Sequence, residues 1–168
     1  TLAASAATAK QLNTIDGATA NIVDATKITS VTADRTANND LDDLITATND
    51  TGVNVSEGTV DVTVTGNALV ANAGNITKVN TLAGQVDKVT LTIAEGSVAV
   101  LDDLTTAGSD DITVSLATGT ATAAQLNTID GATNQTVNAG KITEVTHAAT
   151  TGNDISALIT ATNGTGVD

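Results

Sequence analysis

A long internal repeat constrains this chain more than any other feature of its sequence. The segment from Gln11 to Thr19 returns without change from Gln125 to Thr133, 114 residues later. The likeness extends well beyond that segment, because residues 1–54 match residues 115–168 at 33 of 54 positions. We therefore expect residues 1–168 to be one continuous fragment of a longer repeat array, starting and stopping inside the 114-residue period.

Short strands and short helices are predicted to alternate within the period. Apolar and polar residues alternate in 60–64, 89–93 and 112–116, which predicts strands, and 28–31 and 142–145 are weaker versions of the same pattern. Aliphatic residues with helical spacing predict helices over 9–15 with its copy 123–129, 41–45 with its copy 155–159, 76–82 and 101–104. Each helix is short enough to depend on packing for its stability.

The spacing of these elements predicts an α/β solenoid. The strand anchors Val31, Val64, Ile93, Leu116 and Val145 are 33, 29, 23 and 29 residues apart, so about four β-α units make one period. Units of this length bury one apolar stripe against each neighbour. Strands joined through helices run parallel, so we predict a single-layer parallel sheet with helices on one face. An all-β solenoid is the main alternative, and a row of immunoglobulin-like sandwiches fits less well because core aromatics are absent.

Composition excludes several classes of function. The chain has no cysteine for disulfides or thiolate metal sites, and its one histidine, His147, is too few for a histidine zinc site. It has no aromatic residue to stack on a base, and its net charge of −13 repels phosphates, so we expect no nucleic-acid partner. No apolar run approaches the roughly 20 residues that span a bilayer, so we expect no membrane insertion. No nucleophile–base pair stands out, and we predict that the chain is not an enzyme.

Two groups of residues are candidates for binding. Three acidic pairs offer the hard oxygen ligands that calcium prefers, and we take them as candidate weak calcium ligands: Asp42, Asp43, Asp102, Asp103, Asp110 and Asp111. The competing interpretation is a solvated acidic face, because the second copy has Ser156 and Ala157 in place of the first pair. The outward face of the predicted strands carries hydroxyl groups that form a candidate binding surface: Thr63, Thr90, Thr92 and Thr113.

The repeated strings resemble a known class of proteins. Residues 122–133 (TAAQLNTIDGAT) and 154–162 (DISALITAT) are similar to units of giant repetitive proteins that are secreted or displayed on the surface of marine bacteria, cyanobacteria in particular. The first string also resembles repeats of phage tail fibres, which usually contain aromatic residues. The resemblance implies an extracellular structural or adhesive array and supplies no catalytic residues.

Two functional classes follow from these observations. The first is a non-enzymatic structural or adhesive array that is secreted or on the cell surface, as a matrix, filament or surface-layer component. Its partners would be neighbouring copies of itself or flanking repeats. The second is a binding module whose threonine-rich sheet face holds a glycan, a mineral or ice.

Overall fold

Short helices alternate with short parallel strands in the computed structural model of the chain, which describes all residues except 4, 36–40, 50, 56–57, 148–158 and 163–165. The chain divides into two compact units. Unit 1 comprises Thr1–Ala68 and Lys78–Leu91, and unit 2 comprises Leu69–Thr77 and Thr92–Asp168. Helix α3 (Ala73–Ala83) has residues in both ranges. No helix within the described residues is both long enough and apolar enough to cross a bilayer.

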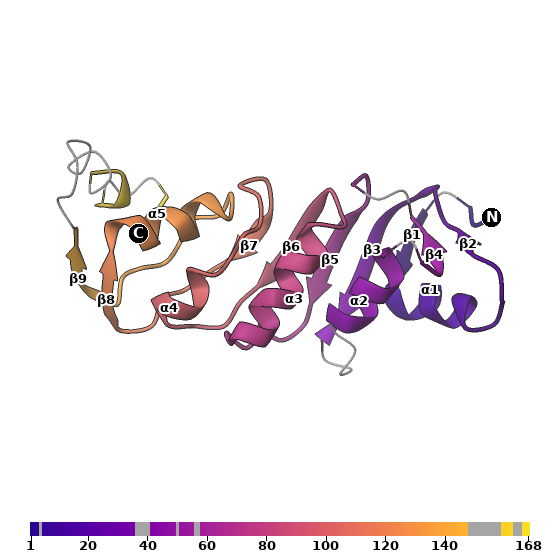
Figure 1. The fold of residues 1–168 in the computed structure, drawn as a ribbon, viewed down its shortest axis with the longest axis horizontal. Coiled ribbons are helices and arrows are strands. Elements are labelled where there is room, and N and C mark those ends of the chain that lie inside the picture. Colours follow the sequence, from indigo (N-terminus) through magenta and orange to yellow (C-terminus); the bar gives the residue numbers. More distant parts are fainter. Residues whose placement is uncertain (4, 36–40, 50, 56–57, 148–158, 163–165) are drawn as a thin grey trace. The chain divides into compact units, whose positions relative to one another are not determined.

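Unit 1 is built on a parallel sheet with helices packed against it. Its strands follow in the order β1 (Ser5–Thr8), β3 (Ile28–Asp34), β5 (Asp61–Thr65) and β6 (Lys88–Thr92). Helices α1 (Ala9–Asp16) and α2 (Leu41–Thr48) lie side by side against β3 (Figure 1). Two shorter strands, β2 (Val23–Asp24) and β4 (Val53–Asn54), pair with each other in a second parallel sheet.

The core of unit 1 joins one face of this sheet to the helices. Val31, Val62 and Val89 are in register on β3, β5 and β6, and all three are fully buried. Leu12 of α1 and Leu44 of α2 are fully buried as well. Apolar residues alternate with polar ones along the strands and recur with helical spacing along the helices. Both patterns therefore place aliphatic side chains in one shared interior.

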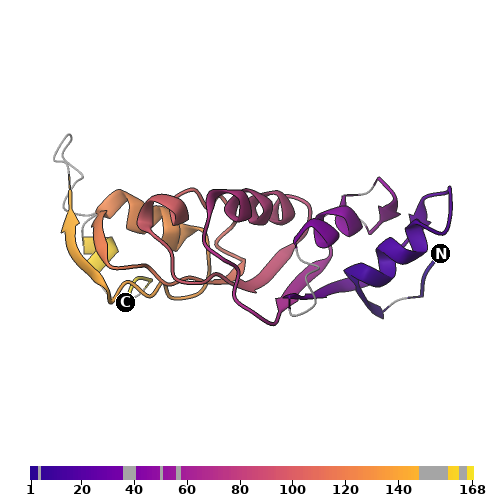
Figure 2. The same cartoon turned by 90° about the horizontal axis from the view of Figure 1, so that it is seen from below.

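Unit 2 repeats this arrangement at its C-terminal end. Strands β8 (Gly119–Thr122) and β9 (Ile142–Thr146) pair in parallel, and α5 (Ala123–Gly131) follows β8 directly. Helix α4 (Val98–Leu101) packs beside α5 (Figure 2), and strand β7 (Asp111–Thr113) follows α4 along the chain. Residues 159–162 are also helical.

The two sequence copies fold alike in detail. Ser5 pairs with Ile28 and the register then shifts by one residue, and Gly119 pairs with Ile142 before the same shift. Helices α1 and α5 each begin with a capping box, formed by Thr8 with Gln11 and by Thr122 with Gln125. The Val23 N–H donates to Gly52 O at 2.8 Å, and the equivalent bond from Val137 to Gly166 has the same length. Within the described residues, the two copies therefore share a register shift, a helix cap and a backbone hydrogen bond.

The α/β class and the parallel strands are confirmed, and several details are corrected. Within the described residues the predicted strands and helices are present, but α4 ends at Leu101 instead of reaching Leu104, and β7 ends at Thr113 instead of Leu116. The prediction of one single sheet is wrong, because β2 and β4 pair in a sheet of their own in unit 1 and β8 and β9 do so in unit 2. Strands β1 and β8 were not predicted, since their alanine, glycine and threonine residues show no apolar alternation. The helix predicted over 155–159 lies largely outside the described residues.

Candidate binding surface

The outward face of the unit 1 sheet carries a row of threonines, one from each strand. Thr8 pairs with Thr32, Thr32 with Thr63, and Thr63 with Thr90. We call these four residues the threonine ladder. Thr32, Thr63 and Thr90 each follow a fully buried valine of the opposite face, so these three point away from the core, while Thr8 ends β1 and caps α1. Neighbouring strands lie about 4.8 Å apart, which sets the spacing of the hydroxyl groups across the sheet.

Charged and polar rows flank the ladder. Ser30, Asp61 and Lys88 form the row two residues before it on the same face. Asp34 and Thr65 form the row two residues after it. The face therefore offers hydroxyl groups bordered by both signs of charge, a surface suited to hydrogen bonding with a polar ligand.

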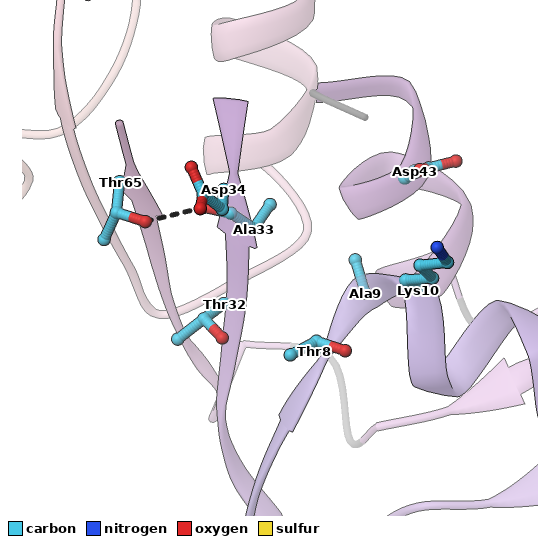
Figure 3. A pocket seen from close by; sticks show the side chains of 8 residues that line it. All are labelled: Thr8, Ala9, Lys10, Thr32, Ala33, Asp34, Asp43 and Thr65. Atoms are coloured by element: carbon cyan, nitrogen blue, oxygen red, sulfur yellow. Dashed lines mark hydrogen bonds between the residues drawn. The ribbon is translucent and has the colours of Figure 1, made fainter. Parts of the chain in front are cut away.

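Hydroxyl groups of the ladder and of the row that flanks it already form hydrogen bonds within the fold. The Thr8 hydroxyl accepts a hydrogen bond from the Gln11 N–H at 3.1 Å, which caps the N-terminus of α1. Thr65 donates to the carbonyl oxygen of Ala33 at 3.3 Å, which ties β5 to β3 (Figure 3). Such bonds hold the hydroxyl groups in fixed places.

A shallow groove lies at the end of the ladder (Figure 3). Its volume is about 200 Å³, and it is lined by Thr8, Ala9, Lys10, Thr32, Ala33, Asp34, Asp43 and Thr65. Sites for small molecules usually enclose about 300–1,000 Å³, so this groove is small for one. It offers one ammonium group, two carboxylates and hydroxyls, which suits contact with part of a hydroxyl-rich ligand.

Two of the four predicted surface threonines belong to the ladder. Thr63 and Thr90 are direct partners across β5 and β6. Thr92 lies two residues beyond Thr90 on the same strand and is exposed, and Thr113 is exposed on β7 of unit 2. The sequence analysis missed Thr8 and Thr32. Their copies Thr122 and Thr146, which are also paired, were the signal that would have found them.

The acidic pairs are spread over several elements. Asp42 is exposed on α2 and forms an ion pair with Lys78 at 2.6 Å, while Asp43 lines the groove. Asp102 donates its backbone N–H to Val98 O at 2.8 Å at the end of α4, and Asp103 is exposed. None of these four residues faces a second acidic pair in the structure as described.

Asp110 and Asp111 hold local structure in unit 2. The buried carboxylate of Asp110 accepts the Ala107 N–H at 2.9 Å and closes the loop before β7. The carboxylate of Asp111 accepts from Gln135 Nε2 at 3.1 Å. Across the described part of the chain, no three acidic or histidine side chains gather closely enough to hold a metal ion. Calcium binding therefore stays a prediction, tested below.

One carboxyl group has a shifted pKa. Hydrogen bonds from the Thr26 hydroxyl at 2.8 Å, from the Thr1 hydroxyl at 2.8 Å and from the Thr26 N–H hold the pKa of Asp24 below its ordinary value. Asp24 lies on β2 and is bound by these neighbours, so its carboxylate has a structural role.

Comparisons with models of known protein families, with curated proteins and with solved structures found no match.

Proposed function

We propose that this chain is a non-enzymatic structural or adhesive segment of a repeat array, in which β-α units follow one another as a solenoid. The observation that supports the proposal is a set of local features shared by the described parts of the two copies. Residues 114 positions apart share a register shift, a capping box and backbone hydrogen bonds. A repeat unit whose contacts recur in the next copy can be added many times along a chain without a change of fold, as solenoids are built.

The chemistry of the chain supports a place outside the cell, on the surface or in a matrix. The chain has no cysteine or methionine to oxidise, and its net charge is −13. Such a charge keeps a repetitive chain soluble and self-repelling at low salt. The resemblance to secreted and surface-displayed repetitive proteins of marine bacteria points the same way.

The proposed array would place its own neighbours in contact, so its partners would be flanking repeats or further copies. The described functional groups support the fold, as Thr8, Asp24 and Asp110 do through their hydrogen bonds.

A second candidate function rests on the threonine ladder. Hydroxyl groups in register on one sheet face, beside the groove of about 200 Å³, favour a module that binds a glycan, a mineral surface or ice. The test is the binding of polysaccharides, calcium mineral and ice by the chain, compared with a Thr32→Ala/Thr63→Ala variant. Unchanged adsorption of the folded variant would remove this candidate.

The array proposal is tested by lengthening the chain. We would append residues 55–114 and then 1–54 after Asp168, which continues the sequence by one period, and measure small-angle X-ray scattering from both chains. A solenoid lengthens while its cross-sectional radius of gyration stays constant. A cross-section that grows with the added period would contradict the proposal. Antibody labelling of intact cells of the source organism tests the location.

A further inference from the structure

Identical nonapeptides in the two copies have different exposure. Ile129, Ala132 and Thr133 at the end of α5 are buried, with Ile129 at 0% exposure. The equivalent Ile15, Ala18 and Thr19 at the end of α1 are exposed, with Ile15 at 40%. Because the local sequence is the same, the difference comes from what packs against each helix. We call Ile15, Ala18 and Thr19 the N-terminal face.

In unit 2, residues 97–113 pack over the end of α5 and bury the equivalent face. Helix α4 packs beside α5, and the Thr106 hydroxyl donates to Ala132 O at 2.5 Å. The Ile112 N–H donates to the Thr133 hydroxyl at 3.0 Å. That hydroxyl lies 2.8 Å from Ile112 O and 3.1 Å from Asp110 O, either of which can accept its proton. A short helix, a loop and a strand therefore bury this face and satisfy its polar groups.

The N-terminal face is already shaped for the same contacts. The Asn21 N–H donates to the Thr19 hydroxyl at 3.1 Å, and the Gln135 N–H donates to the Thr133 hydroxyl at the same distance. Thr19 is thus oriented as Thr133 is.

We propose that the N-terminal face is a docking surface for a β-α unit of the kind formed by residues 97–113. The occupant brings a short apolar helix to cover Ile15 and a strand whose backbone N–H donates to the Thr19 hydroxyl. A folded second copy of this chain cannot supply that unit, because its own residues 97–113 already cover α5. The partner is therefore a unit outside these 168 residues. This inference rests on the proposed repeat array and names what its units use to bind one another.

The test joins residues 55–114 to the front of Thr1, so that the added residues 97–113 precede α1 as they precede α5. The matched control carries the same residues after Asp168, where the period also continues. In the first chain we expect hydrogen exchange at the Thr19 amide to slow to the level of the Thr133 amide. We also expect Ile15→Ser to lower the unfolding midpoint as much as Ile129→Ser does. In the control chain, hydrogen exchange at the Thr19 amide should stay fast, and Ile15→Ser should lower the unfolding midpoint only slightly.

The outcomes separate this inference from the array proposal. If scattering shows that both chains lengthen while Thr19 still exchanges fast in the first, the docking surface is overturned and the array stands. If neither added segment becomes protected from exchange, both proposals fall. Equal slowing of Thr19 in both chains would mean that general stabilisation, and not docking, protects the face, and would also overturn the inference.

Discussion

At the scale of single residues, a glycine is required where neighbouring side chains leave no room for a Cβ. A Cβ built on Gly96 would lie 2.4 Å from the Cβ of Ala71 and 3.2 Å from Leu101 Cδ1. Gly119 on β8 has no atom within 4 Å of such a Cβ, and the first copy has Ser5 in its place. The two glycines look alike in the sequence, and only the packing distinguishes them.

We expect Gly96→Ala to lower the free energy of unfolding by about 1–3 kcal/mol, because the added methyl group has no room in the core of unit 2. Gly119→Ala is the matched control, and we expect it to be neutral or stabilising by up to about 1 kcal/mol. Urea unfolding followed by circular dichroism measures both. Equal effects of the two substitutions would contradict the crowding at Gly96.

The pKa of Asp24 leads to a prediction about pH. Its folded pKa lies below the ordinary value of 3.8, so the ionised form stabilises the fold above that value. This contribution is lost as the pH falls through the folded pKa. We expect the difference in unfolding midpoint between the chain and Asp24→Asn to be largest near neutral pH and to shrink below pH 3.8.

The second copy supplies the control for this prediction. Asn138 occupies the position of Asp24, and its Oδ1 accepts the Gly140 N–H at 3.2 Å as Asp24 Oδ1 accepts the Thr26 N–H at 3.3 Å. The hydroxyl of Thr26 has no equivalent at Gly140. Asn138→Asp should therefore increase the pH dependence of the unfolding midpoint only slightly. The increase it causes should be smaller than the decrease caused by Asp24→Asn. A difference for Asp24→Asn that does not change with pH would contradict a depressed pKa.

At the scale of elements, each strand has one face in the core and one outside. Val62 and Thr63 are neighbours on β5, and Val62 is fully buried while Thr63 belongs to the threonine ladder. The alternation of residues 60–64 predicted both faces. It did not predict β1, whose alanines are too small to signal a strand, and the ladder begins two strands before Thr63, at Thr8 of β1 and Thr32 of β3.

We expect Val62→Thr to destabilise the chain by about 1–3 kcal/mol, because it buries a hydroxyl group among aliphatic side chains. Thr63→Val exchanges the same two side chains one residue later, and it should change stability by no more than about 0.5 kcal/mol. Thermal or urea unfolding of the two variants gives the comparison. A larger loss for Thr63→Val would mean that the two faces of β5 are assigned the wrong way round.

At the scale of the whole molecule, acidic charge dominates the response to ions. With a net charge of −13, the chain repels itself, so we expect sodium chloride to raise the unfolding midpoint by screening. The described carboxylates do not gather into a metal site. We therefore expect millimolar calcium chloride to shift the midpoint no more than magnesium chloride at the same concentration, starting from chelator-treated protein.

A calcium shift several degrees larger than that of magnesium would show that acidic pairs act as ligands. Asp42→Asn/Asp43→Asn, Asp102→Asn/Asp103→Asn and Asp110→Asn/Asp111→Asn would then locate the site, since only substitution of the pair that binds calcium would abolish the shift. The Asp110 variant also removes the hydrogen bond to the Ala107 N–H, which lowers its stability by itself. Its calcium shift is therefore measured from its own unfolding midpoint without calcium.

The sequence by itself determined the repeat, the alternation of strands and helices, and the buried side of most elements. These properties are local, because apolar spacing of two or about 3.6 residues decides which side of a strand or helix can leave water. The sequence also marked Thr63 and Thr90 as outward residues. Its local signals were too weak to predict the alanine-rich strand β1 or the residue at which α4 ends.

Only the tertiary structure decided the register of the strands and which helix faces are buried by a neighbouring segment. Connections of unequal length still bring Thr8, Thr32, Thr63 and Thr90 into one row, because backbone hydrogen bonds between parallel strands set the register and the loops absorb the difference. Ile15 and Ile129 lie in the same nonapeptide, yet one is exposed and the other buried. Burial depends on the neighbour that packs against a side chain, and a local sequence does not contain that neighbour.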